Sequence, residues 1–218
     1  MTTIARYFVV LAIASLALAG CFGAQQSSPD SPTGAGGLVP TVKDKDAGLV
    51  AISPNFDVKQ YSVVVVDKFT VTDPAVKDDD DKKLAGEMVV FLQSELVRRL
   101  RESGLFQRVV NLTETELKPD AANALRLDGT ITRLGGGSQA ARAMMGLYGA
   151  GRTRAQADMR FAEAGSGRVV MVTADRRTAS MGFFGGSTRD HFRESFDDMA
   201  RDLAKFLVRL SKGEAPKE

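Results

Sequence analysis

Two stretches of the chain carry apolar residues at helical spacing. The first ends at Gly104, and its apolar positions are Leu84, Met88, Phe91, Leu92, Leu96 and Leu100. The second runs from about residue 188 to residue 210, and its apolar positions are Phe192, Phe196, Met199, Leu203, Phe206 and Leu210. Spacings of three and four place side chains on one face of a helix. We therefore predict two long amphipathic helices.

Three stretches between and before these helices have strand patterns. Residues 61–66 (YSVVVV) form a β-branched run typical of a deeply buried strand. Residues 105–110 follow the first helix as a short apolar run, and residues 125–132 alternate between apolar and polar side chains. A strand, a helix and a second strand in succession form a right-handed crossover, so we expect the first two strands to be parallel.

Two later stretches predict a β-hairpin. Residues 152–163 and 168–181 flank the turn-forming segment AGSG. With Gly165 and Ser166 in the turn, Phe161 faces Val170, Met159 faces Val172, and Ala157 faces Ala174. One face of the hairpin is then consistently apolar.

Together these patterns predict an α+β fold. We expect a two-layer sandwich, in which a mixed β-sheet of about five strands carries two long amphipathic helices on one face. The single domain is predicted to span residues 61–212, a length that supports a sizeable core.

The first residues have the pattern of an export signal. Residues 7–18 are uncharged, and this run is too short to span a bilayer comfortably. The next residues complete the sequence LAGC, which matches the bacterial lipobox in full. We predict a lipoprotein signal peptide at residues 1–20 and lipid attachment, by diacylglycerol and a further acyl chain such as palmitate, at Cys21. The alternative is an ordinary signal peptide or membrane helix with an incidental cysteine.

The segments on either side of the domain are predicted to be loosely structured. Residues 22–41 are rich in Gln, Ser, Pro, Gly and Ala, a composition typical of a flexible linker, with an r.m.s. span of roughly 25 Å. Residues 42–60 are interpreted as a loosely packed arm with a short edge strand. Residues 213–218 are expected to be a disordered tail.

Charge is distributed unevenly along the chain, although the net charge is only +2. Residues 126–193 contain eleven arginines and five acidic residues, whereas residues 22–125 contain twelve basic and sixteen acidic residues. The predicted hairpin register places Arg154 opposite Arg177, with Arg152 on the same polar side. These three arginines are candidate contacts for an anionic ligand. The favoured alternative is internal pairing with aspartates, namely Asp128, Asp158 and Asp175.

Two glycine-rich segments, residues 135–151 and 182–187, lie between the predicted elements. The first lacks the Gly-Lys-Ser or Gly-Lys-Thr sequence of a phosphate-binding loop, so nucleotide binding is not predicted. The large apolar residues of the two segments are a candidate interaction surface at one end of the domain. They are Met144, Met145, Leu147, Tyr148, Phe183 and Phe184.

Catalytic patterns are absent from the sequence. His191 is the one histidine and has no cysteine companions, so a zinc site is not predicted. Ser180 and Ser187 lie near it along the chain, without an identified third member of a triad. The four aspartates at 78–81 lack the spacing and the glycine of a calcium loop, and they are assigned to a solvated helix entrance. We predict a protein that is not an enzyme and has no cofactor or metal.

The chain resembles the DUF 4410 family of uncharacterised bacterial lipoproteins from about Val63 to Leu210. The resemblance rests on five short motifs, namely VVVDKF (64–69), ESGLF (102–106), LRLDG (125–129), GAGR (149–152) and ADRR (174–177). It supports the fold and implies no catalytic residue.

These observations lead to one functional hypothesis and one alternative. The first is an envelope lipoprotein on the periplasmic side of the outer membrane, which binds envelope proteins or builds an assembly. Phe22 favours the outer membrane over the inner, because an aspartate at this position is the usual inner-membrane retention signal. The alternative is a binding module for an anionic envelope ligand, either a glycan or a lipid head group. Nucleic acid is not an expected partner, because no aromatic residues interleave the arginines.

Overall fold

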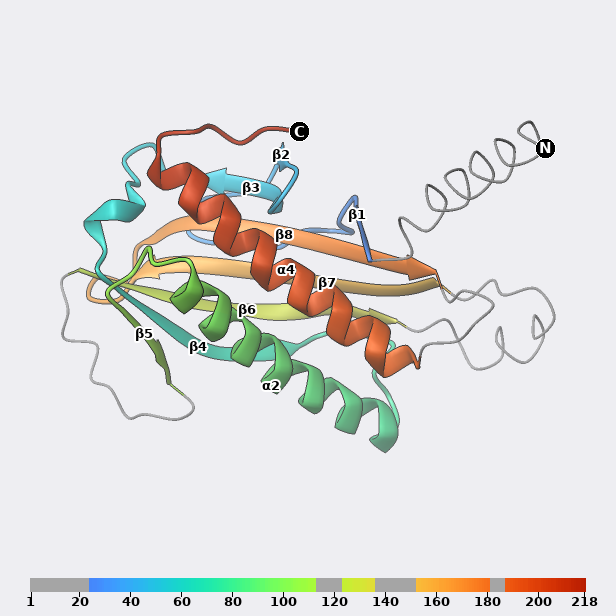
Figure 1. Cartoon of the computed structure of the whole chain (residues 1–218). Coiled ribbons are helices and arrows are strands. Elements are labelled where there is room, and N and C mark those ends of the chain that lie inside the picture. Colours follow the sequence, from blue (N-terminus) through green and yellow to red (C-terminus); the bar gives the residue numbers. More distant parts are fainter. Residues whose placement is uncertain (1–23, 113–122, 136–151, 181–186) are drawn as a thin grey trace, which may run out of the picture.

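A computed structural model describes residues 24–112, 123–135, 152–180 and 187–218, and these form one β-sheet with two long helices on one face (Figure 1). The helices are α2 (Asp79–Glu102) and α4 (Thr188–Ser211), and a short 3-10 helix, η1, spans Val58–Gln60. The strands are β1 (Gln25–Ser27), β2 (Val42–Asp44), β3 (Gly48–Ile52), β4 (Val63–Val71), β5 (Arg108–Asn111), β6 (Ala124–Gly135), β7 (Arg152–Glu163) and β8 (Val169–Ser180).

The sheet is mixed and its strands follow the order β2-β3-β8-β7-β6-β4-β5, with β1 paired to β8. β4 is parallel to both β5 and β6, and the pairs from β6 to β2 are antiparallel. The predicted α+β class, the mixed sheet and the two helices are therefore confirmed. The predicted count of five strands is wrong, because the described sheet has eight. The additional strands, β1 to β3, are three to five residues long, and β3 alone among them coincides with a strand expected from the sequence, the short one within residues 42–60.

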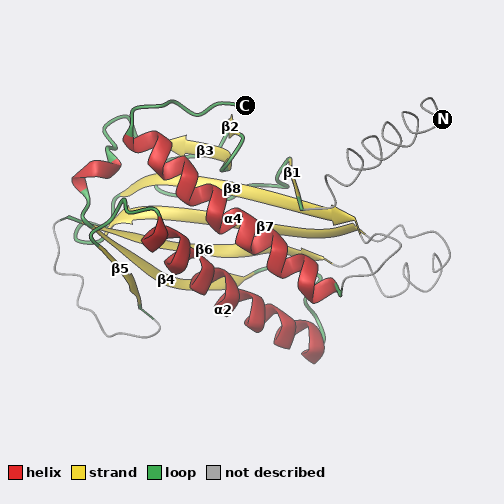
Figure 2. Ribbon diagram, in the orientation of Figure 1, coloured by secondary structure: helices red, strands yellow, loops and turns green. Residues whose placement is uncertain are grey.

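Both helices lie on the same face of the sheet (Figure 2), and the buried apolar side chains of the two layers form one hydrophobic core. Most predicted apolar positions of both helices are fully buried there, and Leu84, Phe91 and Leu210 are partly buried. Both helices begin with a cap: Asp78 Oδ1 accepts the N–H of Asp81, and Ser187 and Asp190 form a capping box. The aspartate run thus begins α2, where its charges favour the helix dipole.

The hairpin of β7 and β8 has a different register from the predicted one. Ala162 lies opposite Val169, as predicted from the turn, but an irregularity between Phe161 and Ala162 shifts every later pair by one residue. Phe161 therefore lies opposite Met171, and Arg154 lies opposite Thr178 instead of Arg177. A bulge moves the following side chains of one strand to the other face, and nothing in the turn sequence indicates it.

Residues 24–41 are part of the folded domain, and the prediction of a flexible linker is wrong for them. β1 pairs with residues 176–178 of β8, and the chain then crosses the sheet face opposite the helices. There the N–H of Asp30 donates to Gln156 Oε1 (2.8 Å) and the N–H of Thr33 donates to Asp158 Oδ2 (2.7 Å). These hydrogen-bond partners lie more than 120 residues away in the sequence, so the local composition cannot reveal them.

The glycines of this segment allow a close approach to the sheet. Gly36 has a φ of +58°, and a Cβ built on it would lie 2.6 Å from Cβ of Val169. A side chain at this position would therefore be strained and would also clash. By composition alone, the same glycines are typical of a flexible segment.

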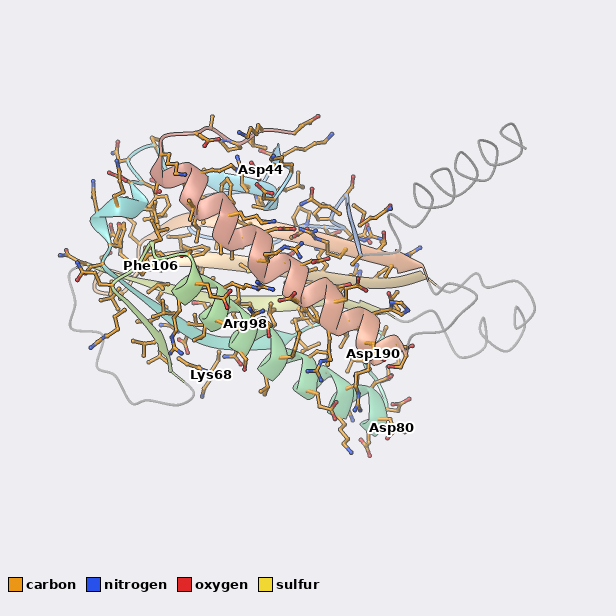
Figure 3. All side chains as sticks on the ribbon, in the orientation of Figure 1. Asp44, Lys68, Asp80, Arg98, Phe106 and Asp190 are labelled. Carbon is orange, nitrogen blue, oxygen red and sulfur yellow. The ribbon has the colours of Figure 1, made fainter. Side chains whose placement is uncertain are left out.

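Residues 42–60 and 213–218 are also fixed. The short strand expected within residues 42–60 is present as β3, whereas the predictions of a loosely packed arm and a disordered tail are wrong. β3 pairs with β8, and Val50 and Val58 are buried at 1% exposure each. The carbonyl of Lys217 accepts the N–H of Lys45 (2.8 Å), and the N–H of Lys217 donates to Asp44 Oδ2 (3.0 Å). Asp44 lies beside β3, near the C-terminal part of α4 (Figure 3).

Candidate functional site

The chain enters the sheet at the end where β8 finishes, and this end is the candidate site. Gln25 lies opposite Thr178, Thr178 opposite Arg154, and Arg154 opposite Gly135. These four residues of β1, β8, β7 and β6 form one row across the sheet, which we call the N-terminal rung. The helix starts lie at the same end, as the labels of Asp80 and Asp190 show (Figure 3).

Both glycine-rich segments join the sheet beside the N-terminal rung. Residues 136–151 connect Gly135 to Arg152, and residues 181–186 connect Ser180 to Ser187. The six apolar residues of the predicted interaction surface lie within these segments and are outside the described residues, as is Cys21. The described residues that flank the two segments lie at one end of the sheet, where Arg152 and Ser180 are paired neighbours.

The three arginines predicted as anion contacts do not form one site. Arg154 is exposed and belongs to the sheet face opposite the helices, and among the described residues no carboxylate pairs with it. Arg177 lies opposite Ala155 and beneath α4, with 6% of its side chain exposed. For Arg152 the structure describes only the backbone, which pairs with Ser180. The grouping of Arg154 with Arg177 is therefore wrong, because the shifted register puts them on opposite faces.

Arg177 is held between two carboxylates in the buried layer. Its guanidinium lies 2.7 Å from Asp175 Oδ2 and 3.2 Å from Asp202 Oδ2 of α4. Burial raises the pKa of Asp175, although Arg177 opposes this. Burial also tends to raise the pKa of Asp202, but hydrogen bonds from Arg201 and Lys205 leave it below its usual value. Arg177 thus joins α4 to the sheet and is not available to a ligand.

Other arginines are also paired internally, as the favoured alternative predicted. Asp128 accepts two hydrogen bonds from Arg160 (2.9 and 2.8 Å) and lies 3.4 Å from Arg126. Asp158 differs from the prediction, because its partners are the amide of Gln156 and the backbone of Thr33. The excess of arginine in the second half of the chain is therefore largely compensated within the fold.

The face opposite the helices carries a polar groove of about 420 Å³. Segment 33–35 forms one wall, and β4, β6 and β7 form the floor. Its charged lining residues are balanced, with Lys68, Arg126 and Arg160 against Asp67, Asp128 and Asp158. This balance gives the groove no preference for either sign of ligand charge.

A second groove, of about 550 Å³, lies between the C-terminal halves of α2 and α4. Its cationic lining residues are Lys45, Arg99, Arg201, Lys205 and Arg209. Four of these have aspartate partners, for example Arg99 with Asp197 at 2.7 Å and Arg209 with Asp44 at 2.7 Å. Internal pairing therefore removes most of the positive charge that an anion would meet.

The described residues contain no group of three or more His, Cys, Asp or Glu side chains arranged to hold a metal ion. Neither α2 nor α4 is long and apolar enough to cross a membrane, a finding that covers the described ranges alone. His191 lies in the first turn of α4, with Nδ1 3.9 Å from Glu194.

Comparison with known proteins identifies a family. Residues 52–182, more than half of the chain, match the family model described as a domain of unknown function, DUF4410. No curated protein matches the sequence.

Among solved structures, a similar one is the PelC dodecamer from Paraburkholderia phytofirmans, with 14% identity and a TM-score of 0.45. The alignment covers 71% of this chain and 94% of the PelC chain. Another is lipoprotein GNA1162 from Neisseria meningitidis, with 11% identity and a TM-score of 0.41, covering 70% and 99%. With TM-scores below 0.5, these likenesses transfer no property to the present chain.

Proposed function

The chain belongs to the DUF4410 family, and on that premise we propose that it is a non-enzymatic envelope lipoprotein, anchored through Cys21 on the periplasmic side of the outer membrane. Its domain binds envelope proteins at the membrane. The surface proposed for this contact comprises the apolar residues of the two glycine-rich segments, Met144, Met145, Leu147, Tyr148, Phe183 and Phe184.

One observation carries this proposal. The lipobox cysteine precedes Gln25 by four residues, and Gln25 lies on the N-terminal rung, where both glycine-rich segments join the sheet. An acyl anchor on Cys21 would therefore bring both segments close to the membrane. Each buried methylene of such an anchor contributes about 0.8 kcal/mol, so two or three chains hold a domain stably on a bilayer.

Replacement of Cys21 by serine tests the anchor. We expect wild-type protein to label with palmitate and to sediment with the outer membrane, and Cys21→Ser to lose both the label and the sedimentation, because serine carries no thiol for diacylglycerol. The measurement is membrane fractionation with metabolic labelling, with Ser27→Ala as the control that keeps both properties. Membrane retention of a Cys21→Ser chain whose signal peptide has been cleaved would contradict the proposal.

The alternative function is a binding module for an anionic glycan or lipid head group. The structure reduces the number of arginines that are candidate contacts for such a ligand. Arg177 is paired within the fold, which leaves Arg154, exposed on the rung, and Arg152, for which the structure describes only the backbone. Arg154→Glu separates the two functions. Loss of binding to anionic lipid or glycan, with protein crosslinks unchanged, would favour the alternative.

A further inference from the structure

The distance between the lipid attachment site and the folded domain is short. A fully extended chain spans at most about 3.6 Å per residue, so four residues from Cys21 to Gln25 reach no farther than about 14 Å. A flexible linker of twenty residues would have let the domain take any orientation. With β1 in the sheet, the point at which the anchor leaves the domain is fixed at the N-terminal rung.

Hydrogen bonds and an ion pair also fix the first residues of the folded domain to the sheet. After β1, the N–H groups of Asp30 and Thr33 donate to Gln156 and Asp158, which are 0% and 5% exposed. Arg176 adds an ion pair with Asp30 at 2.8 Å. Detaching this segment would break both hydrogen bonds and the ion pair together, so the start of the folded chain stays on the sheet.

The broad faces of the domain are poorly suited to lie on a lipid surface. On the outward side of the two helices many side chains are charged and paired with each other, for example Arg98 with Asp197 (2.9 Å) and Arg201 with Asp198 (2.6 Å). Among the described residues of the helices, Val90 is the large apolar side chain that is exposed. The opposite face carries the balanced polar groove. Placing either face on the membrane would remove charges from water, which is unfavourable.

The N-terminal rung carries a positive charge, which anionic lipid head groups attract. Arg154 projects from it and is exposed, with no carboxylate partner in the described part of the chain. The acidic start of α2 lies at the same end but beside β4, across the sheet from β1 (Figure 1). Anionic lipid head groups attract Arg154 on the rung and repel the aspartates at the start of α2. Both effects favour contact between the membrane and the part of this end that β6, β7 and β8 form.

We propose that the domain stands end-on on the membrane, with the N-terminal rung facing the lipid surface and the turn at residues 163–168 pointing away. This inference rests on the proposed lipid anchor at Cys21. About ten residues of β7 separate the rung from the turn, so at 3.3 Å per residue the turn lies about 30 Å farther from the lipid.

Two glycines give a matched pair of labelling sites for a test. A Cβ built on Gly135, on the rung, meets no atom within 4 Å, and the same holds for Gly165 in the turn. Neither has a positive φ, so cysteine fits at both. Cys21 is the one native cysteine and its sulfur would carry lipid, so an introduced cysteine is the single free thiol.

The experiment uses full-length lipidated protein on vesicles of phosphatidylethanolamine and phosphatidylglycerol that contain a lipid with a nitroxide on its head group. We expect a fluorophore on Gly135→Cys to lose most of its emission and a fluorophore on Gly165→Cys to lose little. Gln25→Cys, at another exposed position of the rung, replaces Gly135→Cys as the rung label if the latter does not fold. Equal quenching at the two ends, as for a domain that lies flat, would overturn the end-on orientation.

Flotation of the same samples distinguishes a failure of the end-on orientation from a failure of the proposed lipid anchor. A full chain that does not float with the vesicles contradicts the anchor and the orientation together. A chain that floats, but whose Gly165→Cys label is quenched as strongly as the rung label, contradicts the orientation and leaves the anchor in place.

Discussion

Arg177→Met is expected to lower the free energy of unfolding by about 3–5 kcal/mol, because it leaves buried charge without its partner. Asp175 and Asp202 have 4% and 10% of their side chains exposed, and Arg177 lies between them. Methionine keeps most of the apolar stem of arginine, so the loss reports on the ion pairs. The measurement is urea unfolding at pH 7.

The control for this variant is Arg154→Met, on the neighbouring strand. Arg154 is exposed, so its replacement should change the free energy of unfolding by no more than about 0.5 kcal/mol. The pair Asp175→Leu with Arg177→Met should lose less stability than Arg177→Met alone, because one buried carboxylate is then removed with the arginine. Equal effects of Arg177→Met and Arg154→Met would show that Arg177 is not buried between carboxylates.

The cost of Arg177→Met should also fall as the pH is lowered. Burial raises the pKa of Asp175 in the folded state, and loss of the arginine removes a group that opposes this rise. A group with a raised folded pKa binds its proton more tightly when folded, so the variant gains stability as the pH falls through that pKa. The difference from wild type should therefore be smaller at pH 4 than at pH 7.

Asp44→Asn is the second substitution with a large expected effect, about 3 kcal/mol at pH 7. The side chain of Asp44 is fully buried, and its two oxygens lie 2.7 and 2.8 Å from Arg209 Nη2. It also accepts backbone N–H groups of Asp46, Ala47 and Lys217. One carboxylate thus joins the β2–β3 turn, the end of α4 and the C-terminal residues, and an amide cannot replace its charge.

The acid dependence follows from the pKa of Asp44. Burial tends to raise this pKa, but the bonds from Arg209 and the backbone outweigh burial and hold it below 3.8. A lowered folded pKa contributes stability above pH 3.8, and this contribution is lost as the pH falls through the folded value. Wild type and Asp44→Asn should therefore differ most at neutral pH and converge in acid.

The control is Asp79→Asn in the first turn of α2, where the side chain is 100% exposed. Because this carboxylate is fully in solvent, its replacement should leave the free energy of unfolding nearly unchanged. Acid titrations of wild type and Asp44→Asn that run parallel from pH 7 to pH 2 would contradict the role assigned to Asp44.

The core of the fold could be predicted from the sequence because its signals are periodic and local. Apolar spacing identifies both helices, and apolar, β-branched or alternating runs identify strands β4 to β8. The hairpin register could not be predicted beyond Ala162, because the turn sequence sets the first pair and contains no signal for the irregularity that follows it. Arg154 and Arg177 were consequently placed on one face.

The N-terminal segment and the tail could not be predicted, because their partners are distant in the sequence. The polar and glycine-rich composition of residues 24–41 is typical of disorder, yet Gln156 and Asp158 supply hydrogen bonds that no local pattern indicates. The same holds for Lys217, whose partner Asp44 precedes it by 173 residues. The family resemblance was identified from short motifs, and the match to residues 52–182 confirms it.

Hydrogen exchange at the start of the folded chain tests the central claim most directly, namely that residues 24–38 belong to the domain and fix how the anchor is attached. In the membrane-bound protein, the backbone N–H groups of Asp30 and Thr33 should exchange far more slowly than those of an unstructured peptide, because both donate to side chains of β7. Asp158→Ala should accelerate exchange at Thr33. If both N–H groups of the wild-type protein exchange at the rate of an unstructured peptide, residues 24–38 are a flexible linker and do not belong to the folded domain.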